Sequence, residues 1–158
     1  MKKGLIAALG VAIGTAAGAL TAGKIVGKVA EQKGEKVDKF KSYYNMLNQW
    51  LVIKQEGGNI EKFFLNNGYK SIAIYGMGEM GNRLYEDLKN TSVEVKYAID
   101  KNAASSYSEL DIKDLEDDFP QVDCIVVSAI FAFDEIKEEL EQKVDFTIVS
   151  LEDVIYEL

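Results

Sequence analysis

The chain has 158 residues, of which 47% are hydrophobic and 28% charged, and its formal net charge is −8. This length and composition are typical of a globular protein of about one domain. The chain contains no histidine, which excludes Ser-His-Asp and Cys-His catalysis and disfavours most zinc sites. We therefore predict no catalytic residue and no metal ligand.

The charge is divided unevenly along the sequence. Residues 1–41 carry eight lysines and three acidic residues, a net charge of +5, whereas residues 42–158 carry ten basic and 23 acidic residues, a net charge of −13. An acidic domain repels a nucleic-acid backbone, so we expect neither DNA nor RNA as a partner. The basic segment is instead attracted to anionic lipid.

Residues 4–23 are rich in glycine and alanine and contain no charged residue. As a helix about 30 Å long, this segment matches the hydrocarbon core of a bilayer. Gly10, Gly14 and Gly18 share one face, on which another helix can pack closely. We predict a membrane helix. The alternatives are a signal peptide cleaved near the sequence Ala17-Gly18-Ala19, and a weakly structured tail.

Most of the N-terminal lysines follow this apolar segment rather than precede it. The more positive flank stays in the cytoplasm, so we expect the C-terminal domain to face the cytosol, with a cytoplasmic protein as the alternative. The glycine-rich start and the lysine-rich stretch after it resemble YtxH-like glycine-zipper membrane proteins over about the first forty residues. That resemblance implies the bacterial cytoplasmic membrane.

Residues 35–67 are predicted to form amphipathic linker helices, after a first region of residues 1–34. The first helix, residues 35–55, has apolar residues spaced 3, 4, 3 and 4 apart, which favours packing on the globular domain or on a second copy. These residues are Val37, Phe40, Tyr44, Leu47 and Leu51, and Tyr43 and Trp50 extend the stripe sideways. Gly57 and Gly58 end this helix, and Asn59 is placed to cap a short second one that closes at Gly68.

Residues 68–158 alternate between strand and helix patterns. Apolar runs predict strands at residues 70–75, 93–99, 124–130 and 146–150, and amphipathic spacing predicts helices at residues 79–89, 134–142 and 151–156. The acid-rich connection of residues 101–121 is expected to hold one helical turn near residues 112–115. We therefore predict an α/β fold, a small Rossmann-like parallel sheet of about four strands with flanking helices, preceded by a long N-terminal helical region.

The sequence Gly76-Met77-Gly78-Glu79-Met80-Gly81 lies between a predicted strand and a predicted helix. Asp100 ends the next strand, 24 residues after Gly76, near the spacing of about 20 that dinucleotide-binding loops have. In such a loop the first glycine permits the turn, the second lets a diphosphate approach, and the third allows close helix packing. The alternative is a purely architectural turn, because the bend needs glycine with or without a ligand.

Asp100 is expected to accept hydrogen bonds from ribose hydroxyls and to favour NAD over NADP, because its charge repels a 2′-phosphate. Ser128 follows a predicted strand, so it either reaches the ligand or is a buried polar residue at a strand end. Glu79 argues against a pyrophosphate unless its carboxylate points away. The predicted binding residues are thus Gly76, Met77, Gly78, Glu79, Met80, Gly81, Asp100 and Ser128.

Three runs carry a family resemblance: residues 72–78, residues 97–100 and residues 125–129. They resemble Rossmann-like domains of bacterial polysaccharide-biosynthesis proteins, in particular the nucleotide-sugar-binding N-terminal domain of sugar acyltransferases, and also sugar-epimerase-like accessory domains. The resemblance spans about residues 50–158 and implies that Gly76, Gly78, Gly81 and Asp100 touch the nucleotide. The catalytic repeat domain of the acyltransferases has no counterpart in this sequence.

From Gly68 onward the chain suffices for about one mononucleotide-binding half of a dinucleotide fold. We therefore expect a membrane-tethered module that binds NAD or a nucleotide-sugar, accessory to cell-envelope or exopolysaccharide synthesis, rather than an enzyme. Self-association is expected through the glycine face of residues 10–18 or through the helix from Val37 to Leu51. The alternatives are an NAD-dependent oxidoreductase or epimerase-like protein active only as an oligomer, and a structural membrane protein whose Rossmann-like domain has no ligand.

Overall fold

The computed structural model describes residue 34, residues 36–102 and residues 109–158. The chain divides into two compact units, Met1–Tyr44 and Asn45–Leu158. The predicted membrane segment, residues 4–23, lies outside the described residues. Within the part that is described, no helix is long and apolar enough to cross a membrane.

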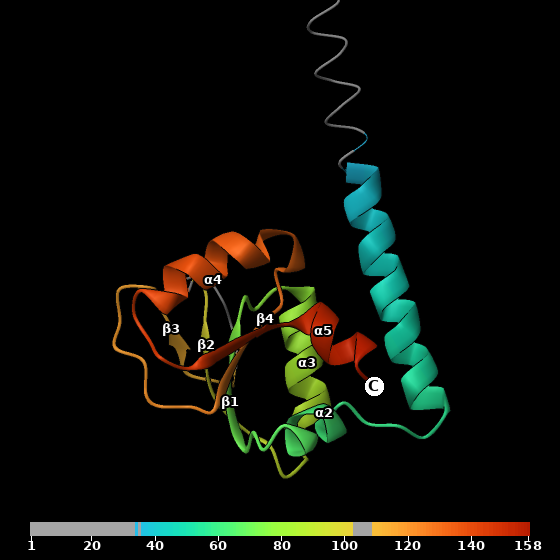
Figure 1. The fold of residues 1–158 in the computed structure, drawn as a ribbon, viewed down its shortest axis with the longest axis horizontal. Helices are drawn as coiled ribbons and strands as arrows, with labels where there is room; N and C mark the ends of the chain where they lie inside the picture. Colours follow the sequence, from blue (N-terminus) through green and yellow to red (C-terminus); the bar gives the residue numbers. More distant parts are fainter. Residues whose placement is uncertain (1–33, 35, 103–108) are drawn as a thin grey trace, which may run out of the picture. The chain divides into compact units, whose positions relative to one another are not determined.

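The second unit is built around one parallel sheet of five strands (Figure 1). The strands are β1 (Ser71–Tyr75), β2 (Glu94–Ile99), β3 (Ile112–Lys113), β4 (Cys124–Val127) and β5 (Thr147–Ser150), in the spatial order β3-β2-β1-β4-β5. The helices are α2 (Glu61–Asn66), α3 (Glu79–Leu88), α4 (Phe133–Glu141) and α5 (Leu151–Tyr156), with a 3₁₀ turn at Ile130–Ala132. The prediction of an α/β fold with a parallel sheet and flanking helices is confirmed.

The strand order reverses direction at β1. From β1 the chain moves outward through β2 to β3, and it then returns to pair β4 with the other side of β1. The carboxyl ends of β1 and β4 therefore form the topological switch point, where open α/β sheets bind their ligands. Gly76 and Ser128 directly follow these two strands.

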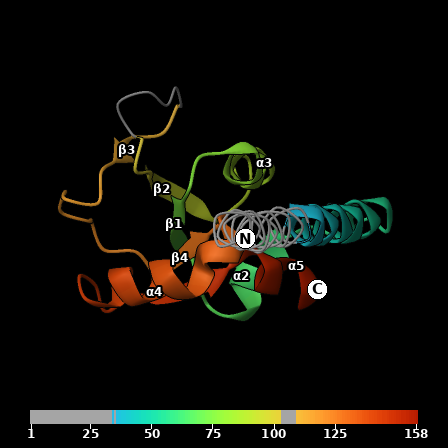
Figure 2. The same ribbon diagram turned by 90° about the horizontal axis from the view of Figure 1, so that it is seen from above.

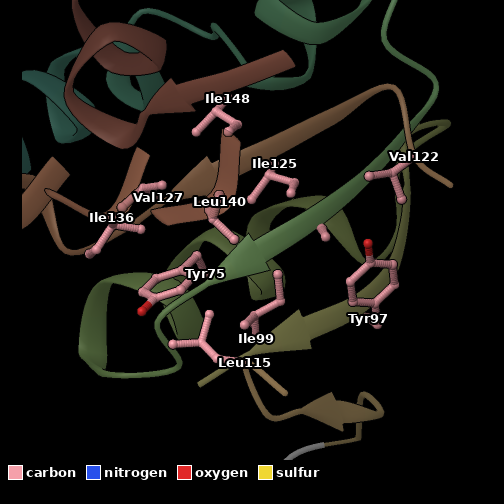
Figure 3. Packing of buried hydrophobic residues seen from close by; sticks show 11 residues of the cluster. Tyr75, Tyr97, Ile99, Leu115, Val122, Ile125, Val127, Ile136, Leu140 and Ile148 are labelled. Carbon is pink, nitrogen blue, oxygen red and sulfur yellow. The ribbon is translucent and has the colours of Figure 1, made fainter. Parts of the chain in front are cut away.

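Helices cover both faces of the sheet, and α3 and α4 lie on opposite sides of it (Figure 2). The face under α4 is a hydrophobic cluster to which alternate residues of four strands contribute, together with Ile136 and Leu140 of α4 (Figure 3). Its strand residues are Ala73, Tyr75, Tyr97, Ile99, Ile125, Val127 and Ile148. Each large aliphatic side chain buried in this way contributes about 1.5–3 kcal/mol to folding.

The helix of residues 36–55 has its buried face inside the second unit. Met46, Trp50 and Ile53 are 0%, 4% and 7% exposed, and their spacing of 3 and 4 places them on one side of the helix. The stripe predicted from Val37 to Leu51 lies on a different side. Four of its members are 53–75% exposed, namely Val37, Phe40, Tyr44 and Leu51. Of the residues that the spacing favoured, only Trp50, at the side of the predicted stripe, belongs to this buried face.

Two details of the predicted α/β region are wrong. Residues 112–113 form strand β3 instead of a helical turn, because the N–H groups of Ala98 and Asp100 bond to the carbonyls of Asp111 and Lys113 at 2.9 and 3.0 Å. The sheet consequently has five strands. Strand β4 also ends at Val127, three residues before the predicted end, because the chain turns away at Ser128.

The glycine signals around α2 are confirmed, but Asn59 is not its N-cap: the N-cap residue is Ile60, and no side chain caps it. The side chain of Asn59 accepts a hydrogen bond from the N–H of Glu61 at 3.0 Å. Gly57 and Gly68 have φ values of +76° and +77°, in the left-handed region that favours glycine at the end of a helix.

Candidate functional site

The glycine loop leaves the sheet at the switch point, and its first glycine is required by the local structure. Gly76 has φ +89°, and a Cβ atom there would lie 2.8 Å from the hydroxyl oxygen of Ser128. Its N–H donates to the carbonyl of Ile99 at 2.8 Å, which keeps the start of the loop in the sheet. Conformation and packing therefore both explain the first glycine.

The third glycine of the motif is required by packing. A Cβ atom on Gly81 would lie 2.0 Å from the carbonyl oxygen of Gly76 and 3.4 Å from the side chain of Ile74. The first turn of α3 thus lies directly against the loop and the end of β1. This is the close helix–sheet approach that the sequence predicted for Gly81.

The second glycine has no such explanation. Gly78 is exposed and has φ −71°, which any residue adopts, and nothing lies within 4 Å of a Cβ atom placed on it. It is the N-cap residue of α3, and this helix begins without a side-chain cap. Because serine, threonine, aspartate and asparagine are the preferred N-caps, the amino end of α3 lacks the side-chain acceptor that most helices use.

The polar groups of the loop backbone are held in place by three side chains. The carboxylate of Asp100 accepts hydrogen bonds from the N–H of Met77 and the N–H of Asn102, both at 2.8 Å. The side-chain amide of Asn82 donates to the carbonyls of Met77 and Gly78 at 2.8 and 3.0 Å. These bonds prearrange the loop before any ligand arrives.

Ser128 is the third of these side chains. It is 5% exposed, and its hydroxyl donates to the carbonyl of Gly76 at 2.7 Å. The structure therefore brings Gly76, Met77, Asp100 and Ser128 together at the carboxyl edge of the sheet. In this structure Ser128 supports the loop. Asp100 also positions Met77, while its carboxylate oxygens retain further lone pairs that a ligand can use.

A groove of about 770 Å³ adjoins the loop. One wall is the last part of the helix of residues 36–55, with Leu47, Trp50, Leu51 and Lys54, and the other is α3. The floor near the amino end of α3 consists of Met77, Gly78 and Glu79. Three of the eight predicted site residues therefore line this groove, whereas Gly76, Met80, Gly81, Asp100 and Ser128 do not.

Three side chains join the two walls of the groove. The indole N–H of Trp50 donates to one carboxylate oxygen of Asp87 at 2.8 Å, and Lys54 forms an ion pair with the other. Trp50 is buried, so this bond also satisfies its only polar group. These contacts fix residues 50–54 against α3 and so create the groove.

Sequence reasoning missed several residues of this region. Asn82, Trp50, Lys54, Asp87 and Arg83 were not predicted as site residues, although all five line the groove. The partners Trp50 and Asp87 are 37 positions apart, so no local pattern relates them. Asn82 did carry a signal, because asparagine is a weak helix former inside a helix unless its amide bonds to the backbone nearby.

Two buried groups of the sheet do not take part in the groove. The hydroxyl of Tyr75, the residue before Gly76, is buried without a hydrogen-bond partner, and burial raises its pKa. Burial also raises the pKa of the Cys124 thiol to about 12. The thiol is therefore protonated and unreactive at neutral pH.

Comparison with known proteins assigns no role to this site. No protein-family model matches the sequence, nor does any curated protein or solved structure. Among the described residues, no group of three or more cysteine, aspartate or glutamate side chains is placed to hold a metal ion.

Proposed function

We propose that this chain is a binding module for a nucleotide or a nucleotide-sugar, with a ligand phosphate at the amino end of α3 beside Gly78. The observation that carries the proposal is the contrast among the three motif glycines. Fold geometry accounts for Gly76 and Gly81 but not for Gly78, where open space lies over an uncapped helix end. A ligand that needs close approach to the backbone accounts for the absence of a side chain there.

The electrostatics of the helix end support an anionic ligand. The free N–H groups of the first turn and the positive end of the helix dipole both favour a phosphate. Arg83, one turn into α3, lines the same groove, and none of the five ion pairs among the described residues includes it. Its guanidinium is suited to bidentate contact with phosphate oxygens. Glu79 is exposed, and its carboxylate has to point away for the phosphate to bind.

The size and polarity of the groove suit the rest of such a ligand. A volume of about 770 Å³ falls within the range of about 300–1,000 Å³ that small-molecule sites occupy. Asp100 does not line the groove, but its carboxylate holds Met77 at the edge of the groove. A ribose that extends past the loop toward the end of β2 would meet this carboxylate, which favours NAD or a nucleotide-sugar over NADP. The described residues of Asn45–Leu158 form one five-stranded sheet, about one half of a dinucleotide fold, which favours binding without turnover over catalysis.

The sequence extends this proposal to the setting of the protein. The uncharged segment of residues 4–23 and the lysines after it support a tether in the bacterial cytoplasmic membrane, with the sheet domain in the cytosol. In that setting the module would serve cell-envelope or exopolysaccharide synthesis as an accessory protein. Extraction of membranes with alkaline carbonate tests the tether, and release of the full chain into the soluble fraction would contradict it.

Calorimetric titration of the full chain with UDP-glucose, NAD and S-adenosylmethionine tests the binding proposal. Saturable binding of UDP-glucose or NAD without turnover is the expected result. Hydride transfer from bound NAD would favour the oxidoreductase alternative, and the absence of binding by all three compounds would leave a structural role.

A Gly78→Asp variant makes the test specific for the proposed site. Aspartate is a good N-cap and its charge suits a helix amino end, so the variant should fold with at least the stability of the wild type. The same carboxylate occupies the phosphate position, so the dissociation constant should rise at least about tenfold, or about 1.4 kcal/mol. Gln142→Glu, an exposed substitution after α4 that adds the same charge, is the matched control and should bind normally.

A further inference from the structure

Two tyrosines of the hydrophobic cluster under α4 differ in how their hydroxyl groups are satisfied. Tyr75 of β1 and Tyr97 of β2 are 4% and 2% exposed. The hydroxyl of Tyr97 donates to the carbonyl of Pro120 at 2.8 Å. In the described part of the chain, the hydroxyl of Tyr75 is the one buried side-chain oxygen or nitrogen that has no hydrogen-bond partner. Because a buried hydroxyl without a partner destabilises a fold, packing alone would favour phenylalanine in place of Tyr75.

The unpartnered hydroxyl lies at the edge of the sheet where the proposed ligand binds. Tyr75 is the last residue of β1 and directly precedes Gly76. Tyr97 instead bonds to Pro120, which comes shortly before β4 and so lies toward the amino edge. Figure 3 shows the two side chains toward opposite ends of the cluster, with the hydroxyl of Tyr75 pointing past the end of β1. Tyr75 therefore places a hydrogen-bond donor at the carboxyl edge, on the face that α4 covers.

We propose that the hydroxyl of Tyr75 donates a hydrogen bond to a sugar hydroxyl of the bound ligand, an inference that rests on the proposed function. A nucleotide-sugar or a dinucleotide has a group on each side of its diphosphate. With a phosphate beside Gly78, one group lies in the groove along α3 and the other crosses the loop. The second group meets the ends of β1 and β2, because the bond between Met77 and Asp100 brings the loop next to the end of β2.

The charges around this hydroxyl favour a neutral group that carries hydroxyls over a second anion. Lys101, Glu139 and Asp100 act electrostatically on the hydroxyl of Tyr75, and Glu135 acts on Lys101. One cation among three carboxylates leaves acidic surroundings, which repel a phosphate. A sugar hydroxyl suits them, because its oxygen accepts a hydrogen bond from the tyrosine while its hydrogen is donated to a carboxylate. Ribose and hexose share this chemistry.

An exposed ion pair lies where the ligand has to enter. Lys101 and Glu139 are 3.3 Å apart, with side chains 60% and 42% exposed. The pair joins the end of β2 to α4, and Tyr75 packs with both elements, since it pairs with Ile99 of β2 and shares a cluster with Ile136 of α4. An ion pair this exposed contributes little to stability and opens readily. Its opening makes room beside the hydroxyl and frees the carboxylate of Glu139 to accept a hydrogen bond from the ligand.

Tyr75→Phe separates a ligand contact from a structural hydroxyl, and Tyr97→Phe is the matched control. Removal of the unpartnered hydroxyl should leave the urea midpoint of the full chain unchanged or raise it, whereas Tyr97→Phe loses its bond to Pro120 and should lower the midpoint. Both variants and the wild type are titrated with UDP-glucose, UDP and NAD. Tyr75→Phe should raise the dissociation constant about fivefold, as expected for the loss of one hydrogen bond, and Tyr97→Phe should leave it unchanged.

The three compounds identify the sugar that Tyr75 contacts. A loss of affinity for UDP-glucose alone assigns the contact to the hexose, and a loss that extends to UDP or NAD assigns it to a ribose. Unchanged affinity of Tyr75→Phe for every compound that the wild type binds would overturn this inference and leave the proposed function intact. A lower urea midpoint for Tyr75→Phe would also overturn it, because the hydroxyl would then have a partner, such as a water molecule, in the free protein. Absence of binding by the wild type would contradict the proposed function and this inference with it.

Discussion

One aspartate forms hydrogen bonds at the amino edge of the parallel sheet, where its strands begin, and another does so at the carboxyl edge, where they end. The two aspartates bond to different parts of the chain. At the amino edge, Asp123 before β4 accepts hydrogen bonds from the N–H of Lys70, the N–H of Ser71 and the hydroxyl of Ser71, at 2.9, 2.8 and 3.0 Å. At the carboxyl edge, Asp100 after β2 accepts from the N–H of Met77 and the N–H of Asn102.

The two edges differ in whether backbone groups beside the aspartate remain available to a ligand. Asp123 joins the starts of β1 and β4, and its bonds complete the connection between two neighbouring strands. Asp100 and Ser128 hold only the beginning of the glycine loop, so the loop is rigid while the amino end of α3 at Gly78 remains uncapped. An aspartate that accepts backbone hydrogen bonds therefore joins two strands at the amino edge, whereas at the carboxyl edge it leaves the backbone of the helix end exposed. Three experiments test this comparison.

Gly81→Ala should have the largest effect on stability. The added methyl group would lie 2.0 Å from the carbonyl oxygen of Gly76, a backbone atom that cannot move away without displacing the loop. We expect a loss of about 3 kcal/mol in the free energy of unfolding, measured by urea denaturation. Gly78→Ala is the matched control and should cost less than about 1 kcal/mol, as an N-cap change in open space. Equal losses would mean that the two glycines do not have the distinct roles assigned to them.

Sequence reasoning predicted this part of the molecule well because its signals are local. The loop motif, the helix after it and the strand before it follow from glycine positions and apolar periodicity, and α5 has the predicted bounds, residues 151–156. Gly81 took its expected packing role because the first turn of a helix after such a loop has little freedom. Strand β3 was missed because two residues have no periodicity of their own, and their conformation depends on hydrogen bonds with β2.

The groove could not be predicted for a related reason. The heptad spacing from Val37 to Leu51 gave the more regular pattern, yet Met46, Trp50 and Ile53 are the residues buried in the unit. Trp50 bonds to Asp87, which is 37 positions away in the sequence, so no local pattern indicates which side of the helix is buried. Asp100 was predicted at its strand end, but its bond to Met77 depends on the loop conformation.

Asp100→Ala and Asp123→Ala should separate stability from binding. Asp100→Ala removes two charge-assisted hydrogen bonds from a half-buried carboxylate, so we expect a loss of about 2 kcal/mol in the free energy of unfolding. It should also weaken nucleotide binding, because Met77 loses its restraint beside the groove. Asp123→Ala should cost less, because its carboxylate is exposed to solvent, and it should leave nucleotide affinity unchanged. A similar loss of affinity in both variants would mean that the sheet, and not the loop, controls binding.

The smallest effect expected is a pH dependence that belongs to the amino edge. Hydrogen bonds from Ser71 and Lys70 lower the pKa of Asp123 below its ordinary value of 3.8. Because the folded-state pKa is the lower one, ionised Asp123 stabilises the fold above the ordinary pKa, and this contribution is lost as pH falls through the folded-state pKa. In urea denaturation from pH 7 to pH 2.5, the wild type should exceed Asp123→Asn in stability at neutral pH, and the difference should shrink below about pH 4. Asp145→Asn, at an exposed position, provides the baseline. A stability difference between the wild type and Asp123→Asn that stays constant down to pH 2.5 would contradict this prediction. It would show that the side chain of Asp123 stabilises the amino edge by its shape and not by its charge.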